Sequence, residues 1–479
     1  MLIISTNSKN CPLAVREKAT GGLVFVEDND NAAICRLKEE AEKHDASGGK
    51  RLECYLILND QTSLWLMQTV GLPKEIGDKV DVLATTMEDL LAKTVFVKLP
   101  NLPSVFPSLD RNPISRESDT TVHLVIIGFS AQAEALAINA ALVAHYPNYI
   151  RDTRLRTRIT IIDENIYEGR DRLTQRYVHL FENSYYRTLD LFDSNPRCIN
   201  RSPIHEKRKE FVDIEWEFVN GNVRSEAFRQ KLTEWSEDGR QQLTIAICHS
   251  DSTQNYDESF GLPQRIYENE IPILCYTDEN EILSMFSSDN AYKSIYPFGK
   301  DWCDIKTLRV LKMLAQRVNY VYHHCFSLEP DDPKTAPSVI VENKLEELWN
   351  GIGPLPKKYS NIFNAMTLGT KMHSVGHTPD DWKSYYALTA DEISILAEVE
   401  HNRWSVEELI LGYRPVTDEE QKSVEADISQ KKVLRARKIH YDLRAFDDLR
   451  ADSTGKNVNV YDMALTQGIP LIIKSCITD

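Results

Sequence analysis

The sequence lacks long apolar runs and paired cysteines. No stretch approaches the about 18 consecutive apolar residues that a membrane span requires, and the first residues contain no basic segment followed by an apolar one. The nine cysteines among 479 residues include no Cys-x-x-Cys pair, which argues against a disulfide framework and against a zinc knuckle. We therefore expect a cytoplasmic protein with reduced cysteines.

Positive charge is also scarce. Lys and Arg total 56 against 72 Asp and Glu, for a formal net charge of -16. Such a charge opposes non-specific attraction to nucleic acid or to an anionic membrane, so we expect no nucleic-acid partner. A small phosphate ligand stays compatible with it, because a local group of backbone N–H donors can outweigh a distant net charge.

Two histidine groups raise the question of a metal site. His323 and His324 precede Cys325, and His373 lies four residues before His377. No further cluster of ligand residues stands near either group, and a metal site needs three or four ligands. We predict no metal site.

Alternating apolar and amphipathic segments predict β/α units around parallel sheets. In residues 1–102 the apolar segments, which are the strand candidates, are 23–26, 54–58 and 95–97, and the amphipathic segments between them are 32–42 and 87–91. Proline-, serine- and charge-rich residues 103–120 and 327–340 predict linkers. Between these, strand candidates lie at 122–127, 158–162, 214–219, 243–248 and 271–276, with helices at 134–145 and around 305–322.

Beyond residue 340 the strand signal fades. Helical candidates lie at 345–349, 359–372, 391–411, 418–432 and 461–467. The sequence thus predicts an α/β protein with two doubly wound, Rossmann-like domains (1–102 and 121–326), followed by a mostly α C-terminal domain (341–479).

The loop after the strand at 122–127 is similar to a dinucleotide-binding turn. Such a turn uses three glycines, and an acid after the next strand binds the ribose. Here Gly128 holds the first position, Ser130 the second and Ala133 the third, and Asp163 follows about 35 residues after Gly128. An arginine-rich insertion at 151–158 accounts for the long spacing, and its arginines form either a solvated rim or a phosphate clamp. A purely structural turn is the alternative to a ligand site.

The second domain resembles the nucleotide-binding domain (RCK or TrkA-N) that regulates bacterial potassium uptake and potassium-channel conductance. The likeness covers residues 122–276 and includes the segments 218–223 and 249–251, with Asn222 where the family has an acid. The resemblance implies a homodimer and a site for NAD or another adenine nucleotide. The ligand residues that it implies are Gly128, Phe129, Ser130, Ala131, Gln132, Asp163, Glu164, Asn220, Gly221 and Asn222.

A C-terminal helix carries an unexpected carboxylate. Thr389 and Glu392 have the spacing of a capping box, so a helix begins near residue 390. Glu400 lies on the same face as apolar residues such as Leu396 and Trp404. A desolvated carboxylate needs a donor, which an Arg or Lys of a neighbouring chain, His401 or a ligand amine could supply. Internal pairing and ligand binding both stay open.

The C-terminal part resembles the repeat domain (RyR) first named in ryanodine receptors, which also occurs in bacterial proteins. The match rests on segments 400–404, 412–413 and 437–443, followed by Phe446, Asp447 and Leu449. The resemblance implies a ligand-sensing or docking module that is not a catalyst, in which a cation and aromatic rings meet. The residues that it implies are Glu400, His401, Arg403, Trp404, Tyr413, Lys438 and His440.

Together these features predict a cytoplasmic regulatory protein that senses a nucleotide-like small molecule and has no catalytic activity. A channel role would act through a separate membrane channel or effector protein. The first alternative is a ligand-free protein-interaction scaffold. The second is an NAD(P)-dependent oxidoreductase, which would need a catalytic acid or base that no recognisable motif supplies.

Overall fold

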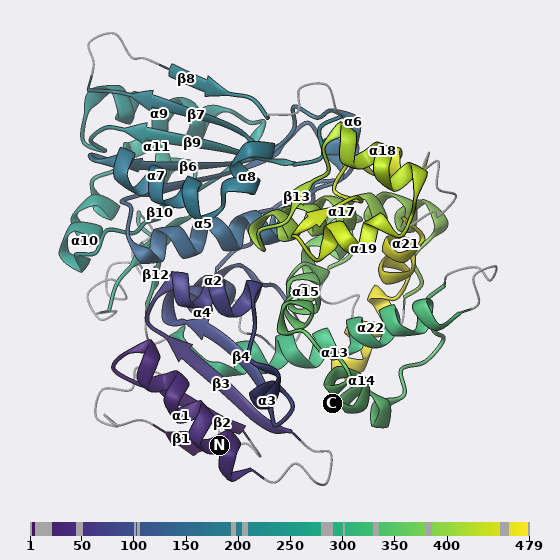
Figure 1. The fold of residues 1–479 in the computed structure, drawn as a ribbon. Helices are drawn as coiled ribbons and strands as arrows, with labels where there is room; N and C mark the ends of the chain where they lie inside the picture. The colour runs from purple at the N-terminus through teal and green to yellow at the C-terminus, as the bar shows by residue number, and fades with distance from the viewer. Residues whose placement is uncertain are drawn as a thin grey trace.

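The structure is a computed structural model that describes residues 2–4, 22–44, 51–99, 102, 106–192, 198–203, 209–278, 291–299, 302–328, 335–378, 386–450 and 459–477. It is a mixed α/β protein with parallel sheets and many helices (Figure 1). Within the described residues, no helix is both long and apolar enough to cross a membrane.

The N-terminal part is a four-stranded parallel sheet in the order β1-β2-β3-β4. Its elements are β1 (Leu2–Ile4), β2 (Gly22–Val26), α1 (Asp30–Lys43), β3 (Leu52–Leu58), α2 (Gln61–Thr69), α3 (Lys74–Gly77), β4 (Val80–Thr86) and α4 (Met87–Phe96). The prediction of a strand at 95–97 is wrong, because Val95 and Phe96 end helix α4. Every residue of α4 from Asp89 to Phe96 is buried, and a helix buried all round has no amphipathic pattern by which to recognise it.

The second part is an eight-stranded sheet in the order β12-β11-β10-β5-β6-β9-β7-β8, parallel except for the β7–β8 pair. Its strands are β5 (Thr121–Ile127), β6 (Thr157–Asp163), β7 (Tyr185–Asp190), β8 (Cys198–Arg201), β9 (Ile214–Asn220), β10 (Gln241–Ile247), β11 (Ile273–Tyr276) and β12 (Ile295–Phe298). From β5 the chain forms β6, then β7 and β8 at the edge, and returns to insert β9 between β6 and β7. It then builds outward on the other side of β5 through β10, β11 and β12. The order therefore reverses beside β5, which is where doubly wound sheets bind their ligands.

Both faces of this sheet are covered. Leu124 and Ile126 of β5 face one apolar core, and Val125 and Ile127 face another, since successive side chains of a strand alternate. The helices of this part are α5 (Ala131–Val143), α6 (Asn148–Arg151), α7 (Ile166–Arg176), α8 (Val178–Asn183), α9 (Glu226–Glu237), α10 (Ser252–Phe260) and α11 (Gln264–Glu268). Helix α5 starts three residues before the predicted helix, because Ser130 caps it.

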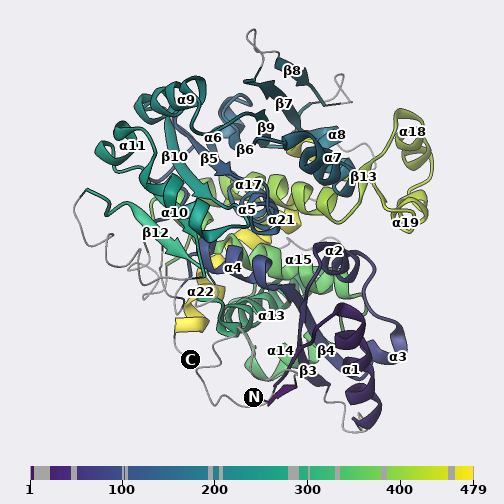
Figure 2. The same cartoon turned by 90° about the vertical axis from the view of Figure 1, so that its left-hand side faces the viewer.

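The C-terminal part is mostly helical, and together with the long helix α13 (Ile305–Ser327) it packs against helices α2 and α4 of the first part and α5 and α8 of the second (Figure 2). It follows α13 and contains η3 (Glu342–Lys344), α14 (Leu345–Asn350), α15 (Leu355–Met366), α16 (Leu368–Ser374), α17 (Ala390–Ile410), α18 (Asp418–Ala426), α19 (Gln430–Arg435), α20 (Phe446–Arg450), α21 (Asn459–Gln467), α22 (Ile469–Ile477) and the short parallel pair β13 (Arg414–Pro415) and β14 (Ile439–His440). The predicted capping box of Thr389 and Glu392 is confirmed at the start of α17.

One apolar core runs through all three parts. It includes Tyr55 of the first sheet, Phe218 of the second and Trp349 of the C-terminal helices. The described part of the predicted linker 103–120 has no helix or strand, but it buries Phe106 and Ile114 in this core. A substitution in the core of one part therefore alters the packing of side chains in the other two parts.

Candidate functional site

The turn after β5 brings the chain from the central strand into a helix N-terminus. Gly128 has φ +87°, a conformation that favours glycine, and a Cβ there would lie 2.6 Å from Nδ1 of His249. The backbone N–H of Gly128 donates to the carbonyl of Ile162 at 2.8 Å. Ser130 then caps α5 by accepting a hydrogen bond from the N–H of Ala133 at 3.3 Å. The first N–H groups of such a helix have no acceptor within it and carry partial positive charge.

The acid at the end of β6 holds this turn. One carboxylate oxygen of Asp163 accepts the N–H of Phe129 at 3.0 Å, and the other accepts the N–H of Asn165 at 2.8 Å. Asp163 is half-buried, and a carboxylate has about four acceptor positions, so capacity for further donors is left. Asp163 therefore lies against the glycine turn, as a ribose-binding acid would.

The carboxyl end of β9 lies beside the carboxyl end of β6. Asn220 pairs with Asp163 in the strand register and donates from Nδ2 to Asp190 at 3.1 Å, while its buried Oδ1 accepts no hydrogen bond from any residue that the structure describes. The N–H of Gly221 donates to the carbonyl of Asp163 at 3.1 Å, and Asn222 donates to Glu164. The implied ligand residues of this part thus lie along one carboxyl edge of the sheet, at the ends of β6 and β9, in the loops after β5, β6 and β9, and in the first turn of α5.

Phe129 is held against the next helix. Its ring packs on Gly169 of α7 so closely that a Cβ at Gly169 would lie 2.0 Å from a ring carbon. The guanidinium of Arg172 lies 5.6 Å from the centre of the same ring. Sequence reasoning missed Gly169, although a glycine inside a predicted helix is a recognised sign of close packing.

The arginine-rich insertion lies at the opposite edge. Arg151 pairs with Asp119, Arg154 with Asp152, Arg156 with Glu210, and Arg158 with Glu215. Residues 151–158 lead into the amino end of β6, whereas ligands of doubly wound sheets bind at carboxyl ends. Of the two interpretations of these arginines, their pairing favours a structural rim.

Glu400 of α17 lies in a buried ion cluster. Arg403 donates to both carboxylate oxygens at 2.9 Å, Asn364 donates at 2.7 Å, and Lys371 donates as well. Glu400 is 2% exposed and Arg403 is 1% exposed. Burial opposes ionisation, yet Arg403 and Lys371 outweigh it and lower the pKa of Glu400 to about 2. The donor that the sequence required is thus supplied internally.

The other implied residues of the C-terminal part form a separate aromatic group. Trp404 lies 4.9 Å from His440 in an edge-to-face contact, and His440 lies 5.9 Å from Tyr413. The ammonium of Lys438 lies 4.4 Å from the centre of the Tyr413 ring, which is cation–π distance. Trp404, Tyr413 and Lys438 are half-buried. Burial lowers the pKa of His440 to about 3, and its Nε2 has no hydrogen-bond partner in the described part of the chain.

His401 lies beside the aromatic group. It lies 5.4 Å from Trp404, and its Nε2 lies 2.8 Å from the carbonyl oxygen of Arg444. Burial alone would lower the pKa of His401, but a hydrogen bond to Asp462 raises it above the ordinary value. The structure therefore brings Trp404, Tyr413, Lys438 and His440 together, while Glu400 and Arg403 pair with each other elsewhere.

Comparison with family models, curated proteins and solved structures finds no match for this chain. Among the described residues, no group of three or more His, Cys, Asp or Glu side chains is placed to hold a metal ion.

Proposed function

We propose that this protein is a non-catalytic regulatory protein that binds a nucleotide-like small molecule, NAD or another adenine nucleotide, at the carboxyl edge of the large sheet. The observation that carries the proposal is the turn at Gly128. It lies where the strand order reverses, has positive φ, opens into the capped helix α5 and has Asp163 against it.

Each element of this turn suits such a ligand. A helix N-terminus attracts phosphate through its free N–H groups, and an acid beside it suits ribose hydroxyls. The buried Oδ1 of Asn220 offers a further acceptor at the same edge. The likeness to the potassium-uptake regulatory domain agrees with this arrangement, and the proposal includes the homodimer and the separate channel or effector partner that the likeness implies.

The C-terminal part has a supporting role in the proposal. The aromatic group of Trp404, Tyr413, His440 and Lys438 combines ring faces with a cation, which suits a planar or anionic ligand or a docking peptide. A ryanodine-receptor-type module with this group would transmit or add to ligand sensing. The complete internal pairing of Glu400 favours the alternative, a ligand-free scaffold, for the remainder of that part.

A thermal-shift screen of NAD, ATP, ADP-ribose and cyclic nucleotides tests the proposal. We expect one of them to raise the melting temperature of the native chain, and Asp163→Ala to abolish the rise. The matched control is Asp238→Ala, because Asp238 also accepts a backbone N–H (Arg240, 3.0 Å) but lies before the amino end of β10. A chain that responds to none of the nucleotides, or a loss equal in both variants, would contradict the proposal.

A further inference from the structure

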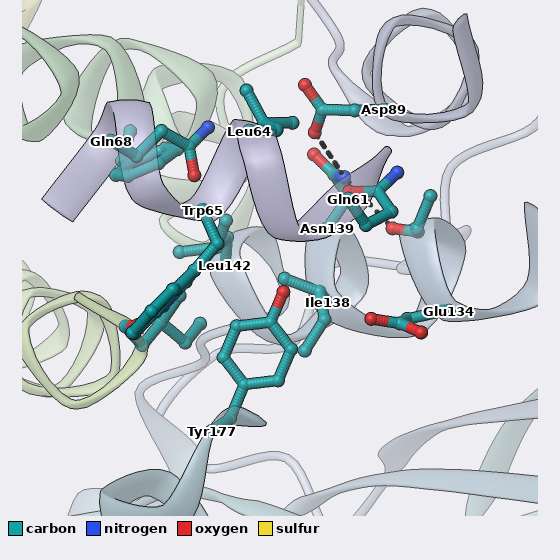
Figure 3. Close-up of a pocket in the computed structure, with 13 residues that line it drawn as sticks. Gln61, Leu64, Trp65, Gln68, Asp89, Glu134, Ile138, Asn139, Leu142 and Tyr177 are labelled. Carbon is teal, nitrogen blue, oxygen red and sulfur yellow. Dashed lines mark hydrogen bonds between the residues drawn. The ribbon is translucent and has the colours of Figure 1, made fainter. Parts of the chain in front are cut away.

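Helix α5 can meet a ligand at its N-terminus, because its side is packed. Side chains of α5 between Glu134 and Leu142 line a small cavity against α2 (Figure 3). This cavity has room for about one water molecule, and the Glu134 carboxylate pairs with Arg176. Ser130 is half-buried and Ala131 is exposed. A nucleotide phosphate would therefore meet α5 at the turn that precedes it.

His249, which follows β10, lies against this turn. The N–H of Cys248 donates to the carbonyl of Ile127 at 2.7 Å, so the carboxyl ends of β10 and β5 are adjacent. A Cβ on Gly128 would lie 2.6 Å from Nδ1 of His249, which puts the ring in contact with the Gly128 backbone. The strand order reverses between β5 and β10, and glycine turns at such places hold phosphate on their backbone. A phosphate bound in this way would have His249 beside it.

Glu258 of α10 sets the orientation of the His249 ring. Nε2 of His249 lies 2.7 Å from Oε2 of Glu258, and Gln254 donates to Oε1 at 3.1 Å. A carboxylate only accepts hydrogen bonds, so Nε2 carries a hydrogen, and in the neutral ring Nδ1 carries none. No hydrogen bond reaches Nδ1 from the residues that the structure describes. The His249 side chain is 17% exposed and that of Glu258 is 5% exposed, so a ligand can reach the histidine while its partner is shielded.

The backbone of this loop is fixed as well. Asn255 accepts the N–H of His249 at 2.8 Å and donates to the carbonyl of His249 at 3.0 Å. Asn255 also donates to the carbonyl of Tyr276 at 2.9 Å, and its side chain is fully buried. Asp251 caps α10 by accepting the N–H of Thr253 at 2.9 Å. The ring is thus held in place before any ligand arrives, which reduces the entropy that binding costs.

Most of the charges around His249 are negative. The charged groups on the elements around the turn are Glu258 of α10, Asp251 of the same loop, Asp163 after β6 and Arg172 of α7, whose guanidinium lies 5.6 Å from the centre of the Phe129 ring. Residues 128–133 include no titratable side chain, and Tyr276 stays neutral because burial raises its pKa. Carboxylates oppose a bound anion unless a neighbouring group becomes positive, and histidine can gain a charge near neutral pH.

We propose that His249 binds a phosphate of the nucleotide through Nδ1–H as an imidazolium, and that the ring takes up a proton from solvent when the phosphate binds. The added proton goes to Nδ1, since Nε2 already carries one, and Glu258 supplies the counter-charge. Binding then weakens as the pH rises, because the neutral ring presents a lone pair to the anion. This contact rests on the proposed nucleotide site, to which it adds a proton-linked ligand residue.

Isothermal titration calorimetry measures the proton uptake. NAD and ADP-ribose are suitable probes, because neither has a group that titrates near neutral pH. Titrations of the native chain in buffers with different ionisation enthalpies should show uptake of up to one proton for each bound nucleotide. The affinity should fall by up to about tenfold for each pH unit above neutrality.

Two variants test the residue itself. In His249→Gln the amide can still donate to Glu258 but has no second nitrogen for the ligand, so we expect affinity about tenfold or more weaker below neutral pH, and no proton uptake. His249→Asn carries its amide nearer to the position of Nδ1 and should recover part of the affinity without proton uptake. The control is His179→Gln, because His179 also lies 3.0 Å from a carboxylate, Glu182, but its helix leads into the amino end of β7. It should bind and take up protons as the native chain does.

Nucleotide binding without proton uptake, or equal uptake in the native chain and His249→Gln, would overturn the role of His249 and leave the nucleotide site standing. An affinity that rises with pH would overturn it too, because Nδ1 would then accept a hydrogen bond, as from a ribose hydroxyl. If neither NAD nor ADP-ribose binds the native chain, the role of His249 is overturned, and the responses to ATP and cyclic nucleotides decide whether the nucleotide site falls with it.

Discussion

The carboxyl edge of the large sheet and the ion cluster of α17 differ in how completely the protein itself pairs their polar groups. At the edge, Asp163 is half-buried and holds backbone N–H groups with capacity left over. In α17, Glu400 is buried and receives donors from Arg403, Asn364 and Lys371. Polar groups that are completed by the protein itself contribute to folding, whereas those with remaining capacity can serve a ligand.

This difference divides the implied site residues of the chain. Glu400 and Arg403 belong with the folded core, although they stand in the most recognisable sequence motif. Gly128, Asp163 and Asn220 belong with a site, although their motif departs from the dinucleotide pattern at Ser130. A motif thus shows that residues share a fold, and only their pairing shows which of them are available.

Removing the buried carboxylate charge of Glu400 should cost more stability than any other change considered below. Glu400→Gln leaves Arg403 and Lys371 buried without it, and breaking a buried ion pair by removing one partner costs about 3–5 kcal/mol. We expect urea unfolding to show a loss of this size. Glu392→Gln is the control, because Glu392 forms the capping box of the same helix, in which a Gln oxygen can accept the same N–H, so we expect a loss below about 1 kcal/mol. Equal losses of unfolding free energy in the two variants would contradict a large contribution of the Glu400 ion pairs to stability.

The same cluster predicts a pH dependence. The pKa of Glu400 is lowered from 4.5 to about 2 in the folded protein, so its stabilising effect is complete above the unfolded pKa. That effect is lost as the pH falls from about 4.5 toward 2, because the unfolded chain then binds the proton first. Unfolding free energies measured over this range should fall more steeply for the native chain than for Glu400→Gln. Parallel curves would contradict the assignment.

A second variant tests the carboxyl edge. Gly128→Ala places a Cβ 2.6 Å from His249 at φ +87°, so both contact and backbone are strained. We expect a loss of about 2 kcal/mol in unfolding free energy, together with loss of nucleotide binding. Gly239→Ala is the matched control, because no atom lies within 4 Å of a Cβ there. If Gly128→Ala has the same unfolding free energy as the control, the turn can accommodate a Cβ, and the predicted contact and backbone strain at Gly128 are wrong.

Much of the fold could be predicted because its signals are local. The strands at 122–127 and 158–162 and the capping box at Thr389 lie within one or two residues of their observed places. Strand β4 was missed because Asp81 interrupts its apolar run. The carboxylate of Asp81 is paired with Lys358, 277 residues away, and with Lys312 of α13. No local pattern could show that a charged residue belongs inside this strand.

The candidate site divides in the same manner. Gly128, Ser130 and Asp163 were recognisable because a glycine turn, a cap and a strand end are short-range features. The partners of Glu400 were not, since Asn364 lies 36 residues away and Lys371 lies 29 residues away in sequence. Their approach depends on how α15 and α16 pack against α17. Sequence reasoning therefore found the carboxylate and its need for a donor, but not the residues that meet that need.

A second buried carboxylate of α17, Glu408, should have the smallest effect on the free energy of unfolding. Glu408 is 5% exposed, and among the described residues no donor reaches one of its oxygens. Burial together with Glu407 raises its pKa from 4.5 to about 8. Between these values the unfolded chain ionises while the folded chain stays protonated, so stability falls as pH rises from about 4.5 and the fall ends above about 8. Glu408→Gln removes this term, and we expect it to gain more than about 1 kcal/mol over the native chain between pH 5 and pH 8 in urea unfolding. The exposed Glu346→Gln of α14 should show no such gain. If the unfolding free energy of Glu408→Gln has the same pH dependence as that of the native chain, the Glu408 carboxylate is paired in the folded protein, as the Glu400 carboxylate is.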